Sequence, residues 1–463
     1  MAVSEGSDDG RRAPPALDQF GMPIKGGEAP ARRRVRRSGG AERGAEPERG
    51  GTADESTDQN LAAQQKIVFG IFVAMTVGIT VLQKIGYGST TFVLPAIVPI
   101  TYAAFAVGIL FARPVFRPER ALLYLAVLIT SALSAILFAK SSAYSSSALY
   151  IVLYLPLLVA FETTQETYRR CLTFFCNIML VFAVIVWIQH AIQFTIGWEY
   201  WPDLDKLVPG QFLVPEFLYI QPLQSGTNFM KPSGITFLEV SFISQFISLA
   251  LIIELMQLQR LTRAAFLGAT LFATFAGTGL LLLLVALPIV FSKLNVRTFV
   301  VALVTAFIAL FVALQLRWFD IVAARLGEFD KQGTSGSSRF IEPLDRVRRG
   351  LLDPNAIYSG IGPGQIERGG NIFWWPFVKA TVEYGLIQGL LLYAFLLYAL
   401  FDRAPSRQFA IILILWYSFE GTLLTPLNPI ALAMLSTMFI LRDAPRTRRS
   451  RSGAQAAAVP AAA

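Results

Sequence analysis

Charged residues are scarce in this chain and unevenly placed. Asp, Glu, Lys and Arg make up 15% of its 463 residues, whereas a typical soluble protein carries about 25%. Residues 1–65 alone hold 10 Lys/Arg and 11 Asp/Glu, so the rest of the chain is more apolar than the overall 54% hydrophobic content. This composition excludes a string of soluble domains and indicates a membrane protein with a polar N-terminal tail.

Histidine and cysteine are nearly absent. The only histidine is His190, inside the apolar run WIQHAIQF, where a helix–helix hydrogen bond is more typical than catalysis. The two cysteines, Cys171 and Cys176, have neither the spacing of a CxxC motif nor that of an obvious bridge, so we interpret them as packing residues. We therefore expect no zinc site, no other bound metal and no cofactor.

We also expect no signal peptide, because no apolar stretch follows Met1. Residues 1–65 are rich in glycine, proline and mixed charge, and we predict a disordered cytoplasmic tail there. Its basic run at 31–37 is either solvated, which we favour, or in contact with anionic lipid. Residues 443–463 are Arg-rich and then Ala-rich, and we expect a second disordered cytoplasmic tail.

Long apolar runs fill the region 66–442. A membrane-spanning helix needs about 20 apolar residues, and on that basis we predict an all-α polytopic membrane protein with about 12 transmembrane helices. Their expected limits are 67–83, 91–112, 120–139, 146–162, 171–196, 234–256, 262–277, 279–293, 298–316, 376–401, 407–421 and 427–442. The runs 264–292 and 408–441 are each either one long span or a hairpin; we favour hairpins, broken at 276–279 and between Glu420 and Pro426.

Arginines orient these spans, since cytoplasmic loops of membrane proteins are enriched in Lys and Arg. The short basic loops contain Arg113, Arg117, Arg120, Arg169, Arg170, Arg260, Arg263, Lys293, Arg297, Arg403 and Arg407. This pattern accounts for the net charge of +9 without a nucleic-acid partner. Both termini are then cytoplasmic, and two larger segments, 197–233 and 317–375, face the opposite side. The second carries eight basic and seven acidic residues and is the main candidate for a functional loop.

The first motif with chemical potential is KPSGITFLEVSF, at 231–242. Pro232 and Gly234 predict a turn that re-enters the membrane after Lys231. Glu239 then lies at or inside the membrane edge, where a carboxylate is costly and must face protein or water. Such a residue suits a general base or acid; a structural glutamate that caps or pairs helices is the alternative.

The second motif lies in the large loop, at 333–354. It places Arg339, Arg346, Arg348 and Arg349 within eleven residues, after Arg325 in the same loop. Arginine binds phosphate through a bidentate fork, and on a helix Arg339 and Arg346 would share one face. The alternative is a solvated amphipathic helix lying on the membrane, with Arg348 and Arg349 near lipid headgroups.

The third motif is the glycine-rich stretch YSGIGPGQIERGGNIFWW, at 358–375. No Gly-Lys-Ser/Thr follows and no strand precedes it, so it is neither a Walker loop nor a dinucleotide fingerprint. Trp374 and Trp375 suit a membrane-interface belt, which we favour, or the stacking of a sugar.

These three pieces, in this order, resemble the superfamily of O-antigen ligases and O-antigen polymerases, which are membrane glycosyltransferases. The resemblance spans about 67–442: KPSGITFLEVSF is similar to the family's re-entry motif, SSRFIEPLDRV with GIGPG to its periplasmic loop, and NIFWWPFVKATVEYGLIQGLL to its Asn-containing helix start. Lys231 stands where the family commonly has Arg. Gly370 precedes Asn371 where ligases have His, which favours the polymerase branch.

The resemblance implies a function in the bacterial inner membrane. Members polymerise or transfer glycans carried on undecaprenyl diphosphate at the periplasmic face, without a metal. It implies Glu239 as catalytic base, with Arg339 as a second catalytic residue. Lys231, Arg325, Arg339 and Arg346 would bind the diphosphate, and Asn371, Trp374 and Trp375 the sugar. Lipid, a chain-length regulator and export proteins are the expected partners.

A transporter or flippase is the rival from another class. Its apolar helices would look the same, but transporters usually carry repeated halves. No internal repeat is visible here, and the 59-residue loop 317–375 has no counterpart in the other half of the chain. A non-catalytic accessory subunit is a further rival, which predicts a dispensable arginine cluster.

Overall fold

The computed structural model describes residues 51–442, except 90–91, 139–142, 216, 218–219, 224–226, 295–298, 301–336, 338–340, 351–357 and 367–373. The chain divides into two compact units, Met1–Glu55 and Ser56–Ala463. Of the first unit, only the opening residues of helix α1 are described, so everything below concerns the second unit.

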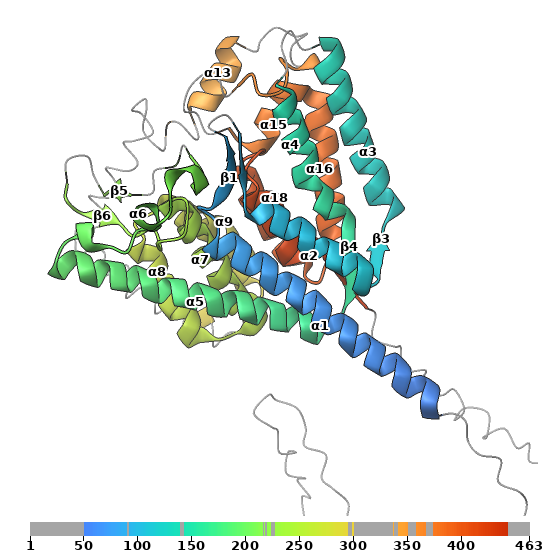
Figure 1. The fold of residues 1–463 in the computed structure, drawn as a ribbon, viewed down its shortest axis with the longest axis horizontal. Coiled ribbons are helices and arrows are strands. Elements are labelled where there is room, and N and C mark those ends of the chain that lie inside the picture. The colour runs from blue at the N-terminus through green and yellow to red at the C-terminus, as the bar shows by residue number, and fades with distance from the viewer. Residues whose placement is uncertain are drawn as a thin grey trace, which may run out of the picture. The chain divides into compact units, whose positions relative to one another are not determined.

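Most of the described chain is helical. The α-helices are α1 (Gly51–Val81), α2 (Ile97–Phe111), α3 (Pro118–Leu133), α4 (Tyr144–Tyr154), α5 (Gln165–Thr195), α6 (Leu204–Leu207), α7 (Val240–Ile253), α8 (Leu261–Ala273), α9 (Gly277–Phe291), α13 (Glu342–Gly350), α15 (Pro376–Tyr384), α16 (Leu386–Phe401), α17 (Arg407–Glu420) and α18 (Leu427–Leu432). Helix α1 begins at Gly51, before the span predicted at 67–83 (Figure 1).

Other helical turns extend or precede these helices. The π-helical turns η1 (Ser134–Phe138), η5 (Glu254–Leu258) and η7 (Ala433–Thr437) continue α3, α7 and α18, and the 3₁₀ turn η2 (Leu155–Leu158) continues α4. The 3₁₀ turns η3 (Trp198–Tyr200) and η4 (Gly210–Phe212) lie in the segment predicted as a large loop at 197–233.

Among the described residues, four helices are long and apolar enough to cross a membrane. They are Gln59–Val81, Pro118–Ile136, Gln165–Thr195 and Val240–Leu258. Six other apolar helices are shorter; α8, with 13 residues, is only about 20 Å long at 1.5 Å per residue. The structure therefore supports a polytopic helical membrane protein and does not confirm the predicted number of spans, one of which, 298–316, lies almost entirely outside the described residues.

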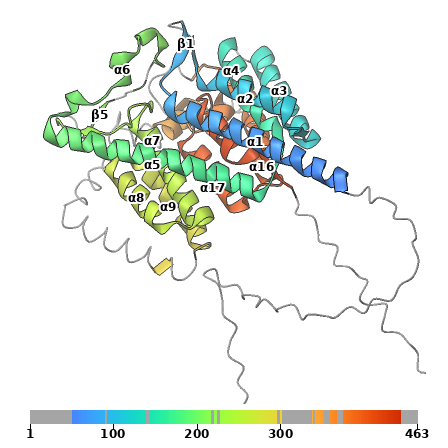
Figure 2. The ribbon, with the colours of Figure 1, turned by 60° about the horizontal axis from the view of Figure 1, so that its bottom comes forward.

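Large apolar side chains on several of these helices are exposed, as expected for a surface that faces lipid. Leu110 of α2 is 74% exposed, Leu122 of α3 66% and Leu284 of α9 63%. In contrast, all of α7 except Ser241 is buried, because α5, α8 and α9 pack around it. Figure 2 shows α8 and α9 side by side beneath α5.

Both predicted hairpins are present. The run 264–292 is interrupted after Ala273, so α8 and α9 are separate helices. The run 408–441 is interrupted between Glu420 and Leu427. The predicted span 376–401 is also split, at Gly385. Its φ of 95° is a backbone angle that glycine adopts readily and that strains other residues.

Three small sheets depart from the all-α prediction. Strands β1 (Gly86–Ser89) and β2 (Phe92–Pro95) form a hairpin where the second span was expected to begin, and β5 (Gln221–Pro222) pairs with β6 (Met230–Lys231). Strand β4 (Val159–Thr163) pairs with β3 (Pro114–Phe116) and, in parallel, with β7 (Phe439–Leu441). The fourth and twelfth predicted spans therefore each end in a strand instead of continuing as helix.

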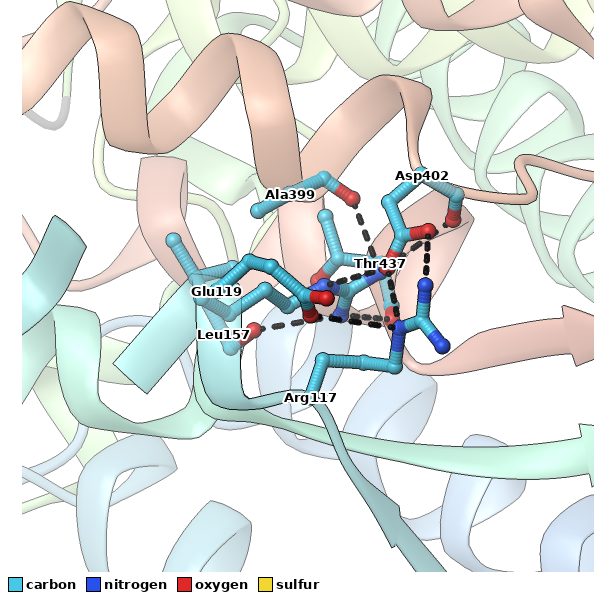
Figure 3. Close-up of polar contacts among 7 residues, drawn as sticks. Arg117, Glu119, Leu157, Ala399, Asp402 and Thr437 are labelled. Carbon is cyan, nitrogen blue, oxygen red and sulfur yellow. Dashed lines mark hydrogen bonds and ion pairs between the residues drawn. The ribbon is translucent and has the colours of Figure 1, made fainter. Parts of the chain in front are cut away.

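A buried arginine fixes the end of the bundle that carries these strands. Arg120 is fully buried, and its guanidinium donates hydrogen bonds to four carbonyl oxygens, those of Leu157 (3.3 Å), Thr437 (3.1 Å), Ala399 (3.1 Å) and Asp402 (3.4 Å). Arg117 forms a two-pronged pair with the Asp402 carboxylate, at 3.1 Å for each bond (Figure 3). Carbonyl groups left over at the ends of three helical segments are thereby satisfied.

Contacts between loops show which loops lie together at each end of the bundle. At one end, which we call the arginine end, Gln257 donates to Ser406 and the Arg442 amide donates to Thr163. Figure 1 shows α13 at the opposite end of α3 and α4 from β3 and β4. We call this opposite end the loop end; it comprises the described residues within 82–96, 197–239 and 358–376. All these loop contacts join segments that the arginine pattern assigns to one side of the membrane.

Candidate functional site

The glycine-rich stretch singled out in the sequence contacts the turn between α15 and α16 at the loop end. The amides of Ile361 and Gly362 donate to the carbonyl oxygens of Val382 (2.9 Å) and Glu383 (3.0 Å), at the C-terminal end of α15. Gly360 and Gly385 both have positive φ, 76° and 95°. The glycine-rich loop is thereby fastened to the turn between α15 and α16. We call this contact, centred on Gly360 and Gly385, the glycine crossing.

Side chains are sterically excluded from this glycine crossing. A Cβ atom on Gly360 would lie 2.5 Å from the Glu383 carbonyl oxygen, and one on Gly385 would lie 2.2 Å from that of Tyr358. Both obstacles are backbone atoms, which cannot rotate away. The two glycines are therefore required by close approach of the backbones as well as by their φ angles.

Helix α13 docks onto the same crossing through a small apolar cluster. Ile366, Trp374 and Val382 form its buried centre, and Val347 of α13 packs against it with Ile361 and Val378. This cluster joins α13, the glycine-rich loop, the start of α15 and Trp374 into one unit. The Ser337 hydroxyl donates to Glu342 Oε1 (3.2 Å) at the first residue of α13.

Helix α15 contributes two buried charges that the sequence reading did not single out. Lys379 is 6% exposed and Glu383 is fully buried, one turn apart on the same face. The Ile366 amide donates to Glu383 Oε1 (3.4 Å), so the carboxylate lies under the glycine-rich loop. The signal was present: ionisable residues are rare in a membrane-embedded run such as 376–401 and are usually functional.

The segment that carries Lys231 and Glu239 is held by glutamine side chains from the long helix α5 and from the loop just after α1. Gln193 and Gln189 of α5 accept the amides of Met230 (2.7 Å) and Gly234 (2.9 Å). Gln83, just after α1, accepts the Leu238 amide (2.8 Å). The predicted turn is therefore real, and α7 begins only at Val240 instead of at 234.

Glu239 occupies the N-cap position of α7, with extended backbone angles. It is buried, at 8% exposure, but its side chain makes no capping hydrogen bond. Capping was one of the two structural roles that competed with a functional one. Lys231 is likewise buried, at 9% exposure, in strand β6.

A buried lysine, Lys84, follows Gln83, the residue that accepts the Leu238 amide. Lys84 is 1% exposed and pairs with Asp205 (3.2 Å) and Asp203 (3.6 Å), which belong to the predicted loop 197–233. Burial raises the pKa of Asp205, in spite of the opposing effect of Lys84. These ion pairs fasten the 197–233 segment to the end of α1.

The predicted site residues are placed unevenly. Trp374 is buried in the apolar cluster, and Trp375 packs edge-on against Phe419 of α17, with 6.2 Å between the ring centres. Arg346 lies in α13, but its side chain is not described. Arg325, Arg339 and Asn371 lie outside the described residues. The described contacts gather the second and third motifs and hold the Lys231–Glu239 segment separately, on α1 and α5.

The expectations for histidine and cysteine agree with the structure. His190 is buried among phenylalanine rings, and its Nε2 bonds to the Ala273 carbonyl oxygen (2.8 Å). Cys171 and Cys176 are both buried and not disulfide-bonded. Within the described parts of the chain, no group of three or more His, Cys, Asp or Glu is arranged to hold a metal.

Comparison with known proteins assigns no family. No protein-family model matches the chain, and neither a curated protein nor a solved structure does.

Proposed function

We propose that this chain is a membrane glycosyltransferase of the bacterial inner membrane. It polymerises oligosaccharide repeat units carried on undecaprenyl diphosphate into an exopolysaccharide or O-antigen, at the periplasmic face, with both termini in the cytoplasm. The glycine crossing is the observation that carries the proposal. It makes one unit of the two family-like segments GIGPG and Glu383–Gly385, and α13, which bears Arg346, packs on that unit.

The reaction needs an activated donor, a base and positive charge. The acceptor hydroxyl oxygen attacks C1 of the donor sugar, and the C1–O bond to the diphosphate breaks with inversion. The acceptor proton passes to a carboxylate, and undecaprenyl diphosphate leaves with the electron pair of the broken bond. Because the diphosphate is already a good leaving group, cationic side chains suffice to stabilise it, and no metal is required.

Glu239 is the proposed base. It lies at the start of α7, where the helix dipole favours the negatively charged carboxylate that a base must present. Burial places it away from bulk water, and the glutamine contacts to 230–238 fix its backbone. These features support a preorganised acceptor of a proton more than a flexible surface residue.

Arg339, Arg346, Arg325 and Lys231 are the proposed diphosphate ligands. Their proposed role is supported by the position of α13. Val347 packs this helix against the glycine crossing, so a helix whose sequence contains three arginines is held at the loop end. Phosphate recognition by arginine depends on its bidentate fork, which lysine lacks. Removing one such donor typically costs about 2.7–4 kcal/mol, or roughly 100- to 1,000-fold in rate.

The test is a deletion strain complemented with Glu239→Gln. We expect normal protein levels, little or no polymer, and accumulation of single lipid-linked repeat units at the periplasmic face, measured by mass spectrometry of extracted glycolipids. Glutamine keeps the shape but cannot take the proton. The matched control is Glu166→Gln, since Glu166 also lies in the first turn of a helix, α5, but at the arginine end; it should leave polymer unchanged.

Other outcomes identify other functions. Repeat units retained on the cytoplasmic face would indicate a flippase, and long chains still attached to lipid would indicate a ligase. Full polymer from Glu239→Gln would remove Glu239 from the mechanism and direct the search to Glu383 and to the acidic residues of 197–233. No change of glycolipids on deletion would refute the proposed function itself.

A further inference from the structure

Several buried polar atoms without hydrogen-bond partners belong to parts of the chain that contact one another around α4. Among the described residues, six such atoms are Ser147 Oγ, Gln365 Nε2, Thr381 Oγ1, Gln388 Oε1, Thr422 Oγ1 and Asn428 Nδ2. Native proteins satisfy nearly all of their buried polar groups, so each exception needs an explanation. Six exceptions from four neighbouring parts of the chain call for a common one.

One face of α4 brings these atoms together. Ser147, Tyr150 and Tyr154 follow one another on that face at helical spacing. Beside Ser147, the Ala143 amide donates to the Pro363 carbonyl oxygen (3.0 Å), two residues before Gln365.

The middle and far end of this α4 face meet the other segments. Tyr150 accepts a hydrogen bond from Gln388 Nε2 and stacks on Tyr384, at 5.1 Å between ring centres. Tyr154 donates to the Leu423 carbonyl oxygen (3.0 Å), next to Thr422.

The remaining members lie against these residues. A Cβ atom on Gly389, which follows Gln388, would lie 2.5 Å from Thr381 Oγ1, so Thr381 lies against the helical turn that carries Gln388. Asn428 Oδ1 accepts the Thr422 amide (3.1 Å), which leaves the Asn428 amide nitrogen as the atom without a partner. These contacts join the segments that carry the six atoms, from the glycine-rich loop to the connection between α17 and α18.

The chemistry of the six atoms selects one class of ligand. Three are hydroxyls, which both donate and accept; two are amide nitrogens, which donate; one is an amide oxygen, which accepts. None of the six is charged, so the set favours neither an anion nor a cation. A ligand that presents several neutral hydroxyl groups matches this mixture.

We infer that this cluster is a binding site for the hydroxyl groups of a glycan. The inference rests on the proposed function and assigns to it a sugar-recognition region distinct from the diphosphate ligands and from Glu239. It adds neutral polar groups to the sugar contacts predicted at Trp374 and Trp375.

The experiment uses variants that remove a polar atom while keeping the shape. Gln388→Met and Thr381→Val are compared with the unaltered full chain in membrane vesicles, with glycolipid extracted from the deletion strain as the probe. We expect each variant to lower the rate of polymer formation about tenfold, as for one lost hydrogen bond to substrate. The thermal unfolding temperature of Thr381→Val should stay equal or rise, because an unsatisfied buried polar atom has been removed. Gln388→Met also loses the hydrogen bond to Tyr150, so its rate is compared at equal amounts of folded protein.

A matched control is available in α2. Thr101 is fully buried, and its hydroxyl has no partner among the described residues either, but it lies outside the cluster. Thr101→Val should leave the rate unchanged. A cluster that holds only water would give full rates in both Gln388→Met and Thr381→Val and would overturn the inference, whereas a deletion strain with normal glycolipids would overturn the proposed function.

Discussion

The guanidinium of Arg120 is shared by more chain segments than any other side chain described above. Its hydrogen bonds reach carbonyl oxygens after α4, α16 and α18, and its Nε lies 3.4 Å from the Asp402 carboxylate. Lysine would place one nitrogen where arginine places three, so it cannot serve these directions together.

We therefore predict that Arg120→Lys is strongly destabilising. Each carbonyl that loses its charged donor should cost about 1.5–3 kcal/mol, seen as a fall in thermal unfolding temperature of the purified chain in detergent. Arg113→Lys, at an exposed arginine in the same loop, is the control and should change little. Equal effects of the two substitutions would show that the carbonyl network does not stabilise the fold.

Asp205 offers a test through pH. Burial raises the pKa of this carboxyl, so the folded state binds its proton more readily than the unfolded state does. The stability that this proton contributes is present at acidic pH and is lost as pH rises through the raised pKa. Asp205→Asn removes the titration.

The variant Asp205→Asn should therefore gain stability relative to the unaltered chain on going from acidic to neutral pH. Thermal unfolding of both proteins over a pH series measures this difference. A difference that instead shrinks towards neutral pH would mean that the pair with Lys84 outweighs burial.

At the scale of elements, the glycine crossing sets a sharp expectation. Gly360→Ala and Gly385→Ala each force a Cβ against a backbone carbonyl and a positive φ. A strained backbone of this kind costs about 1–3 kcal/mol, before any displacement of the loop. Both variants should lower thermal stability and, under the proposed function, polymer yield.

Gly268 in α8 is the control for these substitutions. An added Cβ there would meet only Leu251 Cδ2, at 3.9 Å, and alanine favours a helix interior by about 0.5–1 kcal/mol. Gly268→Ala should therefore be neutral or stabilising. Destabilisation by all three substitutions would remove the special role of the crossing.

The elements that sequence could predict are those with local signals. Glycine and proline marked the breaks after Ala273 and Glu420, and the turn before Glu239 was visible from Pro232 and Gly234. Strand β4 was not predictable, because a short apolar run such as 159–163 looks the same as the end of a buried helix. It pairs with β7, which lies nearly 300 residues further along the chain, and no local sequence pattern indicates a pairing over that distance.

The candidate site was predictable in part for the same reason. The buried lysine and glutamate of α15 stand out against an apolar run, although the sequence analysis did not select them. The ion pairs of Lys84 and the clustering of Ser147, Thr381 and Asn428 arise only when distant segments meet. Such tertiary contacts produce no characteristic spacing of residues that could be recognised in the sequence.

At the scale of the whole molecule, sidedness can be tested with single cysteines. Leu207 is 78% exposed and Tyr358 64%, both at the loop end, while Glu119 is 51% exposed at the arginine end. Leu207→Cys and Tyr358→Cys should react with an impermeant maleimide in intact spheroplasts, and Glu119→Cys only after permeabilisation. The native cysteines are fully buried and need not be removed. Labelling of Glu119→Cys alone in intact cells would invert the proposed topology.

The network around Arg120 also determines when the protein becomes complete during synthesis. Its partner at Leu157 emerges from the ribosome soon after it, but those at Ala399 and Thr437 are the last to be made. Until then, a cation at the edge of the third predicted span has few of its final ligands, and the early helices cannot settle against their neighbours. A nascent chain that stops before Thr437 therefore lacks part of this network and remains a target of membrane quality control, however many helices it has already inserted.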